Sequence, residues 1–487
     1  MQRRDFVRGA GFVFASTLVF GASACAHPAR LSPTVTSARR AFPWGVASAD
    51  PQPDAIMVWT KLVPSIAGVD EDIILQIGRD DQFAMVDHEQ VLAARQINDH
   101  TVRILVNGLR PDTTYFYRFQ SIDGATSRTG RTWTAPATNV AKPVLIALAS
   151  CQSYPASQFG SYRNLIMHEA TTGQRPDFVL HLGDYVYGTR KDLPLDPQTG
   201  LSGPDPLDVQ LSGPMRPGND GADAPALTAS RQNPSSDPAA GQFDYDAALA
   251  ATRDLYAKYH LDRDLQDARA LFPFITIWDD HEFGNDVWQS FSGIGSNPVG
   301  RMAAMQSWSE WVPQVLSENR SLPNLPNEAR DFARTPVETE HISNFDENFL
   351  AQNAQNLAAI GAITGYRALR WGSLVDIIIT DNRSYRGPGA SPAISLDTIA
   401  GGDAPDGIFT GLSLVDGEAL HILAEGRFAN GGNPPEFVTI NGREIVNPRR
   451  DAPRVSLLGA RQKEWFKNAL SSSDAHWKIW ANAEPIM

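Results

Sequence analysis

Four apolar stretches of this chain are each long enough for a buried strand, and each ends in acidic or coordinating residues. They are PVLIALASCQ (143–152), DFVLHLGDYVYG (177–188), LFPFITIWDDHEFGND (271–286) and SLVDIIITDNRSYRG (373–387). Continuous apolar runs are typical of central strands in a sheet that is covered on both faces. In such sheets, ligands bind beyond the carboxyl ends of the strands. We therefore predict that the residues after the four runs meet at one rim.

The residues at this predicted rim are candidate metal ligands and catalytic groups. The four loops would bring together Cys151, Asp184, Tyr187, Asp279, Asp280, His281, Asn285, Asp381 and Arg383. Carboxylate, amide, imidazole, phenol and thiol groups gathered in one place indicate a hydrolase that uses more than one metal ion. The alternation of strands with helical stretches at 157–171, 246–260, 300–318 and 460–471 favours an α/β layer fold.

Two of the loops suggest different ions. Asp184 follows a glycine at a strand end, where a carboxylate can bridge two metals, and Tyr187 lies three residues later. A phenolate and a thiolate such as that of Cys151 suit ferric iron. The alternatives are a surface turn for the Gly-Asp-Tyr tripeptide and a small buried hydrophobic residue for the cysteine.

The sequence WDDHEFGND places two carboxylates and a histidine at consecutive positions, which is costly to bury unless a cation neutralises them. We predict that Asp280 binds metal, supported by Asp279 or by Asn285, whose oxygen is of the kind that Ca²⁺ accepts. His281 could protonate a leaving oxygen or bind phosphate. A solvated acidic loop is the alternative. Arg383 could clamp a phosphate with its planar guanidinium, although a structural ion pair of Asp381 with Arg383 or Arg386 is equally compatible with the sequence.

Residues 1–26 have the features of an export signal. A twin-arginine pair, Arg3-Arg4, precedes an apolar stretch that is too short to span a bilayer. We expect export to the periplasm or beyond by the twin-arginine pathway. The alternatives are an ordinary secretory signal in which the arginine pair occurs by chance and, as a minor one, a lipid anchor on Cys25. Cleavage would remove three arginines and one aspartate, so the net charge of −13 would become −15. Such an acidic chain has no electrostatic reason to bind nucleic acid or an anionic membrane.

The chain divides into two regions that differ in their pattern of apolar, polar and turn-forming residues. Residues 41–137 combine short mixed strands with turn residues, which is typical of an antiparallel β-sandwich, and Tyr115 in LRPDTTY is placed to form a tyrosine corner. This region resembles fibronectin type III modules. Residues 143–487 form the predicted catalytic domain. Two irregular segments within it, 190–243 and 386–454, follow ligand loops and could roof the site.

Taken together, these motifs resemble the alkaline phosphatase D (PhoD-like) family of metallophosphatases. The matching pieces are FPWGVASADPQPDAIMVWTKL, LASCQ, HLGDYVYG, FPFITIWDDHEFGND, RMAAMQSWSEWVP, ITDNRSYRG and LLGARQKEWFKNALSSSDAHWKIWANAEPIM, together with the twin-arginine leader. The resemblance implies a metallophosphatase-like β-sandwich core flanked by helices, behind a fibronectin-like domain. It also implies Fe³⁺ with Ca²⁺: Cys151 and Tyr187 would hold iron, Asp184 would bridge, and Asp280 with Asp279 or Asn285 would hold calcium.

The implied activity is hydrolysis of phosphate mono- or diesters by a metal-activated hydroxide or oxide, with His281 and Arg383 as catalytic groups. One family element is missing from the sequence. The family continues into a Gly-Asp-x-His motif, whereas here Gly183-Asp184 precedes Tyr185-Val186 and Gly402-Asp403 precedes Ala404-Pro405. We therefore expect a truncated chain with an incomplete ligand set. The alternatives are a non-catalytic exported protein that binds phosphate or calcium, and an adhesion or carbohydrate-binding protein, which would leave the acidic strand ends unexplained.

Overall fold

The computed structural model describes most of the chain from residue 41 onward. The described residues are 41–154, 159–187, 244–284, 287–292, 295–315, 332, 334–340, 342, 344–388, 417–440 and 442–484. The predicted leader with Cys25, the irregular segment 190–243 and Asn285 lie outside them. Among the described residues, no helix is both long enough and apolar enough to cross a membrane.

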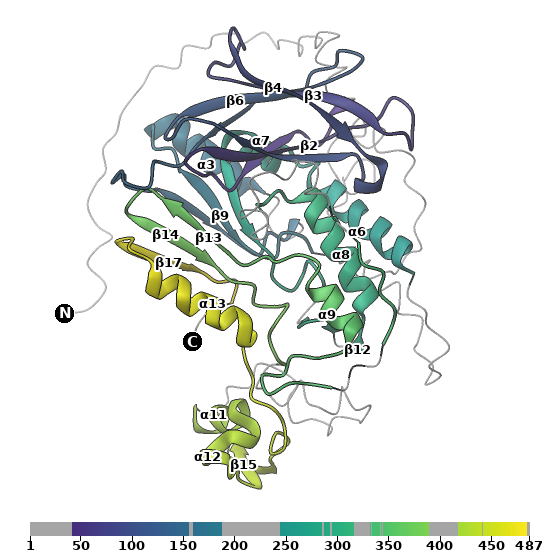
Figure 1. The fold of residues 1–487 in the computed structure, drawn as a ribbon, viewed down its shortest axis with the longest axis vertical. Helices are drawn as coiled ribbons and strands as arrows, with labels where there is room; N and C mark the ends of the chain where they lie inside the picture. The colour runs from purple at the N-terminus through teal and green to yellow at the C-terminus, as the bar shows by residue number, and fades with distance from the viewer. Residues whose placement is uncertain are drawn as a thin grey trace, which may run out of the picture.

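A mixed six-stranded sheet runs through the centre of the molecule in the order β5-β2-β1-β10-β9-β8 (Figure 1). Its strands are β5 (Thr101–Asn107), β2 (Ala55–Lys61), β1 (Val46–Ala49), β10 (Pro273–Ile277), β9 (Phe178–Leu182) and β8 (Ile146–Ala149). The last four are parallel neighbours, and β1, β2 and β5 pair antiparallel. Three of the predicted strands, β8, β9 and β10, are therefore side by side and end at the same edge.

The N-terminal region is the expected fibronectin III-like β-sandwich. A four-stranded antiparallel sheet, β4-β3-β6-β7, lies above β1, β2 and β5 (Figure 1). Its strands are β4 (Val86–Ala94), β3 (Glu71–Gly78), β6 (Thr114–Ser121) and β7 (Gly130–Trp133). A shared core of buried side chains, including Val58, Leu75 and Tyr117, joins the two sheets. The tyrosine corner is confirmed, because the backbone N–H of Arg110 donates to Tyr115 Oη at 2.9 Å.

The other face of the central sheet packs against a small sheet ordered β13-β14-β17. Its strands are β13 (Arg367–Trp371), β14 (Val375–Ile379) and β17 (Trp477–Ala481), of which β14 and β17 are parallel. Helix α13 (Gly459–Ser472) covers the outer face of this sheet (Figure 1). The two sheets give the predicted sandwich core.

Helices flank this sandwich. Helix α3 (Gly160–Thr172) packs against α7 (Arg263–Leu271), and α8 (Pro298–Trp311) lies between α6 (Tyr245–Tyr259) and α9 (Ala354–Ile360). Helices α3, α6, α8 and α13 lie at positions that the sequence predicts, whereas α7 and α9 were not predicted. A separate lobe is visible at the bottom of Figure 1. It comprises α11 (Gly417–Glu425), α12 (Ala429–Gly432) and the hairpin of β15 (Phe437–Ile440) and β16 (Arg443–Val446). The remaining elements are the hairpin of β11 (Phe291–Ser292) and β12 (Gly295–Ser296) and the short helices η1 (Gln96–Asn98) and η7 (Gly426–Phe428).

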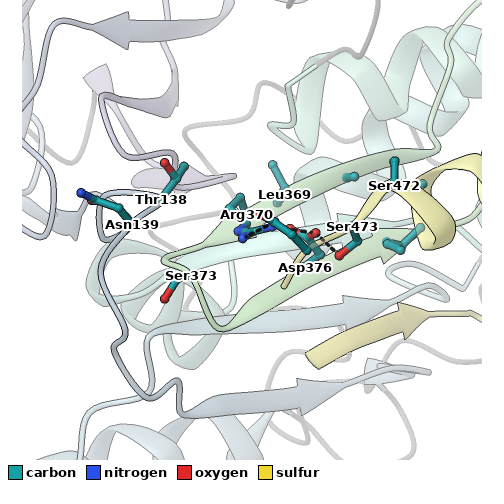
Figure 2. A pocket seen from close by; sticks show the side chains of 12 residues that line it. Thr138, Asn139, Leu369, Arg370, Ser373, Asp376, Ser472 and Ser473 are labelled. Carbon is teal, nitrogen blue, oxygen red and sulfur yellow. Dashed lines mark hydrogen bonds and ion pairs between the residues drawn. The ribbon is translucent and has the colours of Figure 1, made fainter. Parts of the chain in front are cut away.

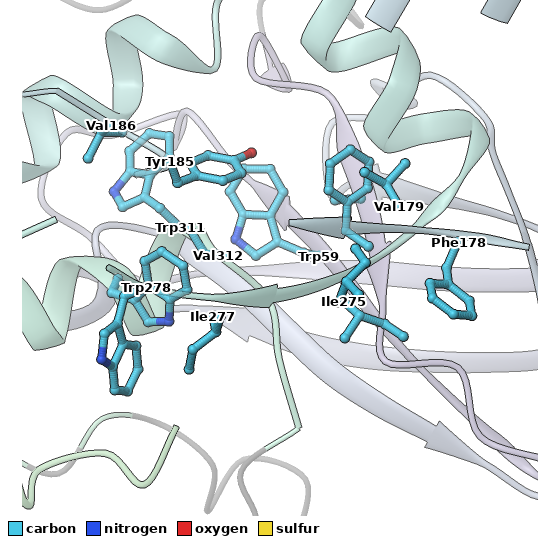
Figure 3. Close-up of a cluster of buried hydrophobic side chains, with 14 of the residues drawn as sticks. Trp59, Phe178, Val179, Tyr185, Val186, Ile275, Ile277, Trp278, Trp311 and Val312 are labelled. Atoms are coloured by element: carbon cyan, nitrogen blue, oxygen red, sulfur yellow. The ribbon is translucent and has the colours of Figure 1, made fainter. Parts of the chain in front are cut away.

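Large aromatic side chains fill the core beside the candidate site. Trp59, Tyr185, Trp278 and Trp311 are all buried in one cluster with the strand residues of β9 and β10 (Figure 3). Trp278 is the residue directly before Asp279, and its indole N–H donates to Asp381 Oδ1 at 2.9 Å. Burial of this ring therefore fixes both the end of β10 and the loop that follows β14.

Two details of the predicted sheet are wrong. The four apolar runs were expected to form central strands covered on both faces. Instead, β8 ends the hydrogen-bonded order of its sheet, and Leu148 is 70% exposed. Strand β14 belongs to the second sheet. Periodicity predicts that a segment is extended and apolar, but not which strand it pairs with, so the number of sheets was not determined by the pattern.

Candidate metal centre

The loops after β8, β9 and β10 meet at one rim, as predicted. The loops after β8 and β9 are joined directly by backbone hydrogen bonds: Cys151 N–H donates to Gly183 O at 3.1 Å, and Gln152 N–H donates to Asp184 O at 3.0 Å. The parallel order of β8, β9 and β10 places all three carboxyl ends together. The side chains that follow these strands are therefore brought within reach of one another by the sheet itself.

Two residues at this rim have left-handed backbone conformations. Cys151 has a φ of +52° and Asp184 a φ of +55°, which costs a non-glycine residue about 1 kcal/mol or more. Such strain persists only where the surrounding structure enforces it, and it concentrates at functional sites. The two turns lie next to each other, since Cys151 N–H donates to Gly183 O, and Tyr187 joins the group because its hydroxyl donates to Asp184 Oδ2 at 2.8 Å.

Asp184 also belongs to a second group, with Asp280 and His281 from the loop after β10. One ligand atom from each of these three residues lies within 4.8 Å of the other two. The backbone N–H of His281 donates to Asp184 Oδ1 at 3.3 Å, and the imidazole ring lies 4.1 Å from the ring of Tyr187, measured between centroids. Asp184 thus contacts Tyr187 through one oxygen and the His281 backbone through the other, and it lies close to Asp280.

Burial and charge at the rim favour a cation. Asp184, Asp279, Asp280 and Glu282 are each at most 8% exposed, and Arg383 is the cationic side chain that contacts two of them. Several buried carboxylates are costly to keep charged without further positive charge. Burial and the Asp184 carboxylate also raise the pKa of the Tyr187 phenol well above its usual value, and partial desolvation raises the pKa of the thiol of Cys151, a residue that is exposed. These donors fit a metal ion, which would stabilise their anionic forms.

Arg383 and Asp279 form a buried, two-point ion pair. Arg383 Nε donates to Asp279 Oδ1 at 2.6 Å and Nη2 donates to Oδ2 at 3.1 Å. Burial by itself would lower the pKa of the guanidinium, but the hydrogen bonds and charge of Asp279 raise it. Both oxygens of Asp279 therefore accept hydrogen bonds from Arg383. In contrast, a carboxylate oxygen of Asp280 lies within 4.8 Å of ligand atoms of Asp184 and His281.

The alternative ion pair between Asp381 and Arg383 does not form through their side chains. Asp381 Oδ1 instead accepts the backbone N–H groups of Arg383 and Ser384, each at 2.9 Å. This carboxylate shapes the turn that presents the guanidinium, which is a structural role. The ion-pair partner of Arg383 could not be predicted from the sequence, because Asp279 is 104 positions away from it.

Two carboxylates at the rim were missed by the sequence analysis. Glu282 accepts the backbone N–H groups of Tyr185 and Asp279, the latter at 2.9 Å, and so ties the loop after β9 to the loop after β10. Burial raises its pKa well above the usual value. Glu484 follows β17 and contacts Arg383 Nη2 at 2.9 Å. A signal existed for both: Glu282 directly follows Asp-Asp-His, and Glu484 follows a fifth apolar strand.

Replacing Gly183 by alanine should disrupt the rim. Gly183 has a φ of +95°, and a Cβ there would lie 2.5 Å from Asp279 Cβ and 2.6 Å from Asp279 N. Backbone strain and overpacking together should lower the free energy of unfolding by about 3 kcal/mol, measured by urea denaturation. Gly173→Ala is a matched control, because Gly173 also has a left-handed φ, of +70°, but open space around it; it should cost about 1 kcal/mol. Equal losses would mean that the contact with Asp279 does not constrain the loop.

A separate pocket of about 820 Å³ is lined by residues other than those of the rim (Figure 2). It is bounded by β13, β14, the end of α13 and residues 138–139, and none of its lining residues is a candidate ligand. Arg370 within it is paired with Asp376 at 3.0 Å and with Asp474 at 2.7 Å. Both of its carboxylates are paired with this one arginine, so this pocket offers no comparable set of ligands.

Comparisons with known proteins agree with this architecture. The sequence profile of the PhoD-like phosphatase family matches residues 146–206 and 230–487, and that of the PhoD-like phosphatase N-terminal domain matches residues 25–136. Alkaline phosphatase D of Bacillus subtilis (strain 168) is 25% identical over 493 residues, which cover 99% of this chain and 62% of that protein. A solved structure described as "Structure of PhoD" superposes with a TM-score of 0.57 at 23% identity, covering 91% of this chain and 62% of that one. This chain thus spans about 62% of the length of the relatives it matches.

Proposed function

Because the chain belongs to the PhoD-like phosphatase family, we propose that it is an exported, metal-dependent hydrolase of phosphate mono- or diesters. The observation that carries this proposal is the cluster of Asp184, Asp280 and His281, whose ligand atoms lie within 4.8 Å of one another beside Tyr187 and Cys151. Buried carboxylates without enough neighbouring positive charge are the setting in which a protein holds cations. The predicted twin-arginine leader supports export, since that route carries folded metalloproteins.

We propose two kinds of ion at this rim. Cys151, Tyr187 and Asp184 would hold Fe³⁺, because thiolate and phenolate groups suit ferric iron. Asp280 would hold Ca²⁺ together with Asn285, while Asp184 would contact both ions. Asp279 serves better as the anchor of Arg383, because both of its oxygens accept hydrogen bonds from that guanidinium. When bound, such ions would lower the pKa of water and stabilise negative charge on phosphorus-bound oxygens.

The protein's own groups would position the ester and move a proton. Arg383, held rigidly by Asp279, would donate hydrogen bonds to the phosphate oxygens and stabilise the charge that develops on them. His281 is half-buried beside Tyr187 and could donate a proton to the leaving oxygen. In this proposal the phosphate is transferred directly to water, without a covalent intermediate on the protein.

Two measurements on one preparation test this proposal. We expect the purified protein to contain iron and calcium in near-stoichiometric amounts by elemental mass spectrometry, and to hydrolyse p-nitrophenyl phosphate or bis(p-nitrophenyl) phosphate. A chelator that removes the metals should abolish turnover, and readdition of iron with calcium should restore it. Metal-loaded protein without turnover of either ester would contradict the enzymatic proposal and favour a non-catalytic phosphate- or calcium-binding protein. Metal-free protein that still hydrolyses the esters would contradict the proposed metal dependence.

A further inference from the structure

The segment after β17 reaches the candidate metal centre and places a carboxylate on its arginines. Glu484 Oε1 lies 2.9 Å from Arg383 Nη2 and also forms an ion pair with Arg386 Nη1. The side chains of both arginines are at most 16% exposed, and that of Glu484 is 22% exposed. One carboxylate thus bridges two largely buried guanidinium groups, the arrangement in which proteins bind a phosphate group.

The position of Glu484 is fixed by the loop after β14. Asn382 Nδ2 donates to Asn482 Oδ1, and Asn482 Nδ2 in turn donates to the backbone oxygen of Glu484. Two residues before Asn482, Trp480 Nε1 donates to Thr380 Oγ1 at 2.8 Å. These hydrogen bonds attach the segment of Glu484 to the loop that carries Arg383 and Arg386. The backbone of Glu484 is therefore held in place independently of the ion pairs that its side chain forms.

The donors of Arg383 are nearly all used in this arrangement. Its Nε donates to Asp279, and its Nη1 donates to Val287 O at 3.4 Å. Its Nη2 donates to Asp279 and lies 2.9 Å from Glu484 Oε1 and 3.7 Å from Asp280 Oδ1. A guanidinium has five N–H donors, so little capacity remains for a further anion. The ion pair with Asp279 lies deeper and has two points of contact, whereas Glu484 is the more exposed partner. A phosphate that needs Arg383 would therefore have to replace Glu484.

We infer that Glu484 is an internal competitor of phosphate: its carboxylate occupies the anion position on Arg383 and Arg386, and the phosphate group of a substrate or product must displace it to bind. This inference rests on the proposed function in one respect, that the rim accepts phosphate. Its consequence is that phosphate binds more weakly than it would without the Glu484 carboxylate. A bound anion loses a hydrogen bond to Arg383 while Glu484 stays, and it is repelled by the carboxylate when both are near.

The isosteric substitution Glu484→Gln tests this role. It removes the charge while keeping the size of the side chain, so inorganic phosphate should bind roughly tenfold more tightly, the order expected for one charge-assisted hydrogen bond. Binding is measured by isothermal titration calorimetry on the metal-loaded full chain. The KM for p-nitrophenyl phosphate should fall by a similar factor. Glu464→Gln is the matched control, because Glu464 is an exposed carboxylate on α13, and it should leave both quantities unchanged.

The outcomes separate the competitor role from the alternatives. Unchanged or weaker phosphate binding in Glu484→Gln, with metal content equal to that of the wild type, would overturn the inference. A fall in metal content would also overturn it, because Glu484 would then be a metal ligand. If Glu484→Gln does not fold, Glu484→Ala is measured in its place, with the same expected tightening. Phosphate binding does not require turnover, so a protein that hydrolyses no ester would contradict the proposed function and still allow the Glu484 comparison.

Discussion

Asp184→Asn should lower phosphate ester hydrolysis by about 1000-fold or more and should release bound metal. Asp184 accepts a hydrogen bond from Tyr187 through one oxygen and from the His281 backbone through the other, so its charge lies between the two halves of the rim. Asparagine removes that charge and one of the two acceptor oxygens. The loss of a shared anionic ligand should cost several kcal/mol in the stabilisation of the reaction. Elemental mass spectrometry and initial rates with p-nitrophenyl phosphate measure both effects.

Asparagine is the informative substitution because it tolerates the left-handed backbone of Asp184, for which φ is +55°. Alanine would add backbone strain to the loss of charge. Asp112→Asn is the matched control: Asp112 has a φ of +50° and lies in the N-terminal sandwich, so activity and metal content should stay at wild-type levels. Full activity with full metal content in Asp184→Asn would exclude Asp184 from the metal centre, and metal loss without loss of activity would separate the bound metal from catalysis.

The residues at the rim could be predicted from the sequence because the underlying rule is local. Cys151, Asp184 and Asp280 each follow an apolar strand, and parallel strands bring their carboxyl ends to one edge. The structure brings Asp184 and Asp280 together with Tyr187 and His281, and it joins the loop of Cys151 to the loop of Asp184. The loop after β14 joins this group although β14 belongs to another sheet, because Trp278 donates a hydrogen bond to Asp381.

Pairings between distant segments could not be predicted. The sequence offered Asp381 as the partner of Arg383, two positions away, and the structure shows Asp279 in that place. The sequence shows which charged residues would need an ion-pair partner if they were buried. Which residue lies close enough to be that partner depends on the tertiary structure. The same limit applies to strand β1, whose pattern resembles that of an ordinary sandwich strand. The parallel pairing of β1 with β10, which makes the N-terminal sandwich continuous with the central sheet, has no local signal.

A buried ion pair reinforces this junction between the two regions. Asp50 follows β1 and is fully buried, and Arg367 begins β13. Arg367 Nε and Nη2 donate to the two oxygens of Asp50 at 2.9 Å and 2.8 Å, and Nη2 also donates to the backbone oxygen of Thr276 in β10 at 2.9 Å. Asp50 further accepts the backbone N–H of Val315 at 2.6 Å. One carboxylate therefore connects the N-terminal sandwich, both sheets of the core and the segment after α8.

Asp50→Ala should lower the free energy of unfolding by about 3–5 kcal/mol, because it leaves the Arg367 guanidinium buried without its anion and places alanine at a φ of +45°. Urea denaturation followed by tryptophan fluorescence measures the loss. The double variant Asp50→Ala/Arg367→Met should recover part of it, since no charge is then buried. Asp254→Ala breaks the more exposed pair of Asp254 with Lys258 and should cost less than about 1 kcal/mol.

The same variant tests whether the two regions unfold as one unit. Strands β1 and β10 share backbone hydrogen bonds and Asp50 lies at their ends, so the N-terminal sandwich should lose its structure together with the core. Far-ultraviolet circular dichroism and tryptophan fluorescence should then give coincident transitions in the wild type and in Asp50→Ala, the latter at lower urea. Two separate transitions, with only the first shifted by the substitution, would mean that the sandwich is an independent domain and that the continuous sheet adds little to its stability.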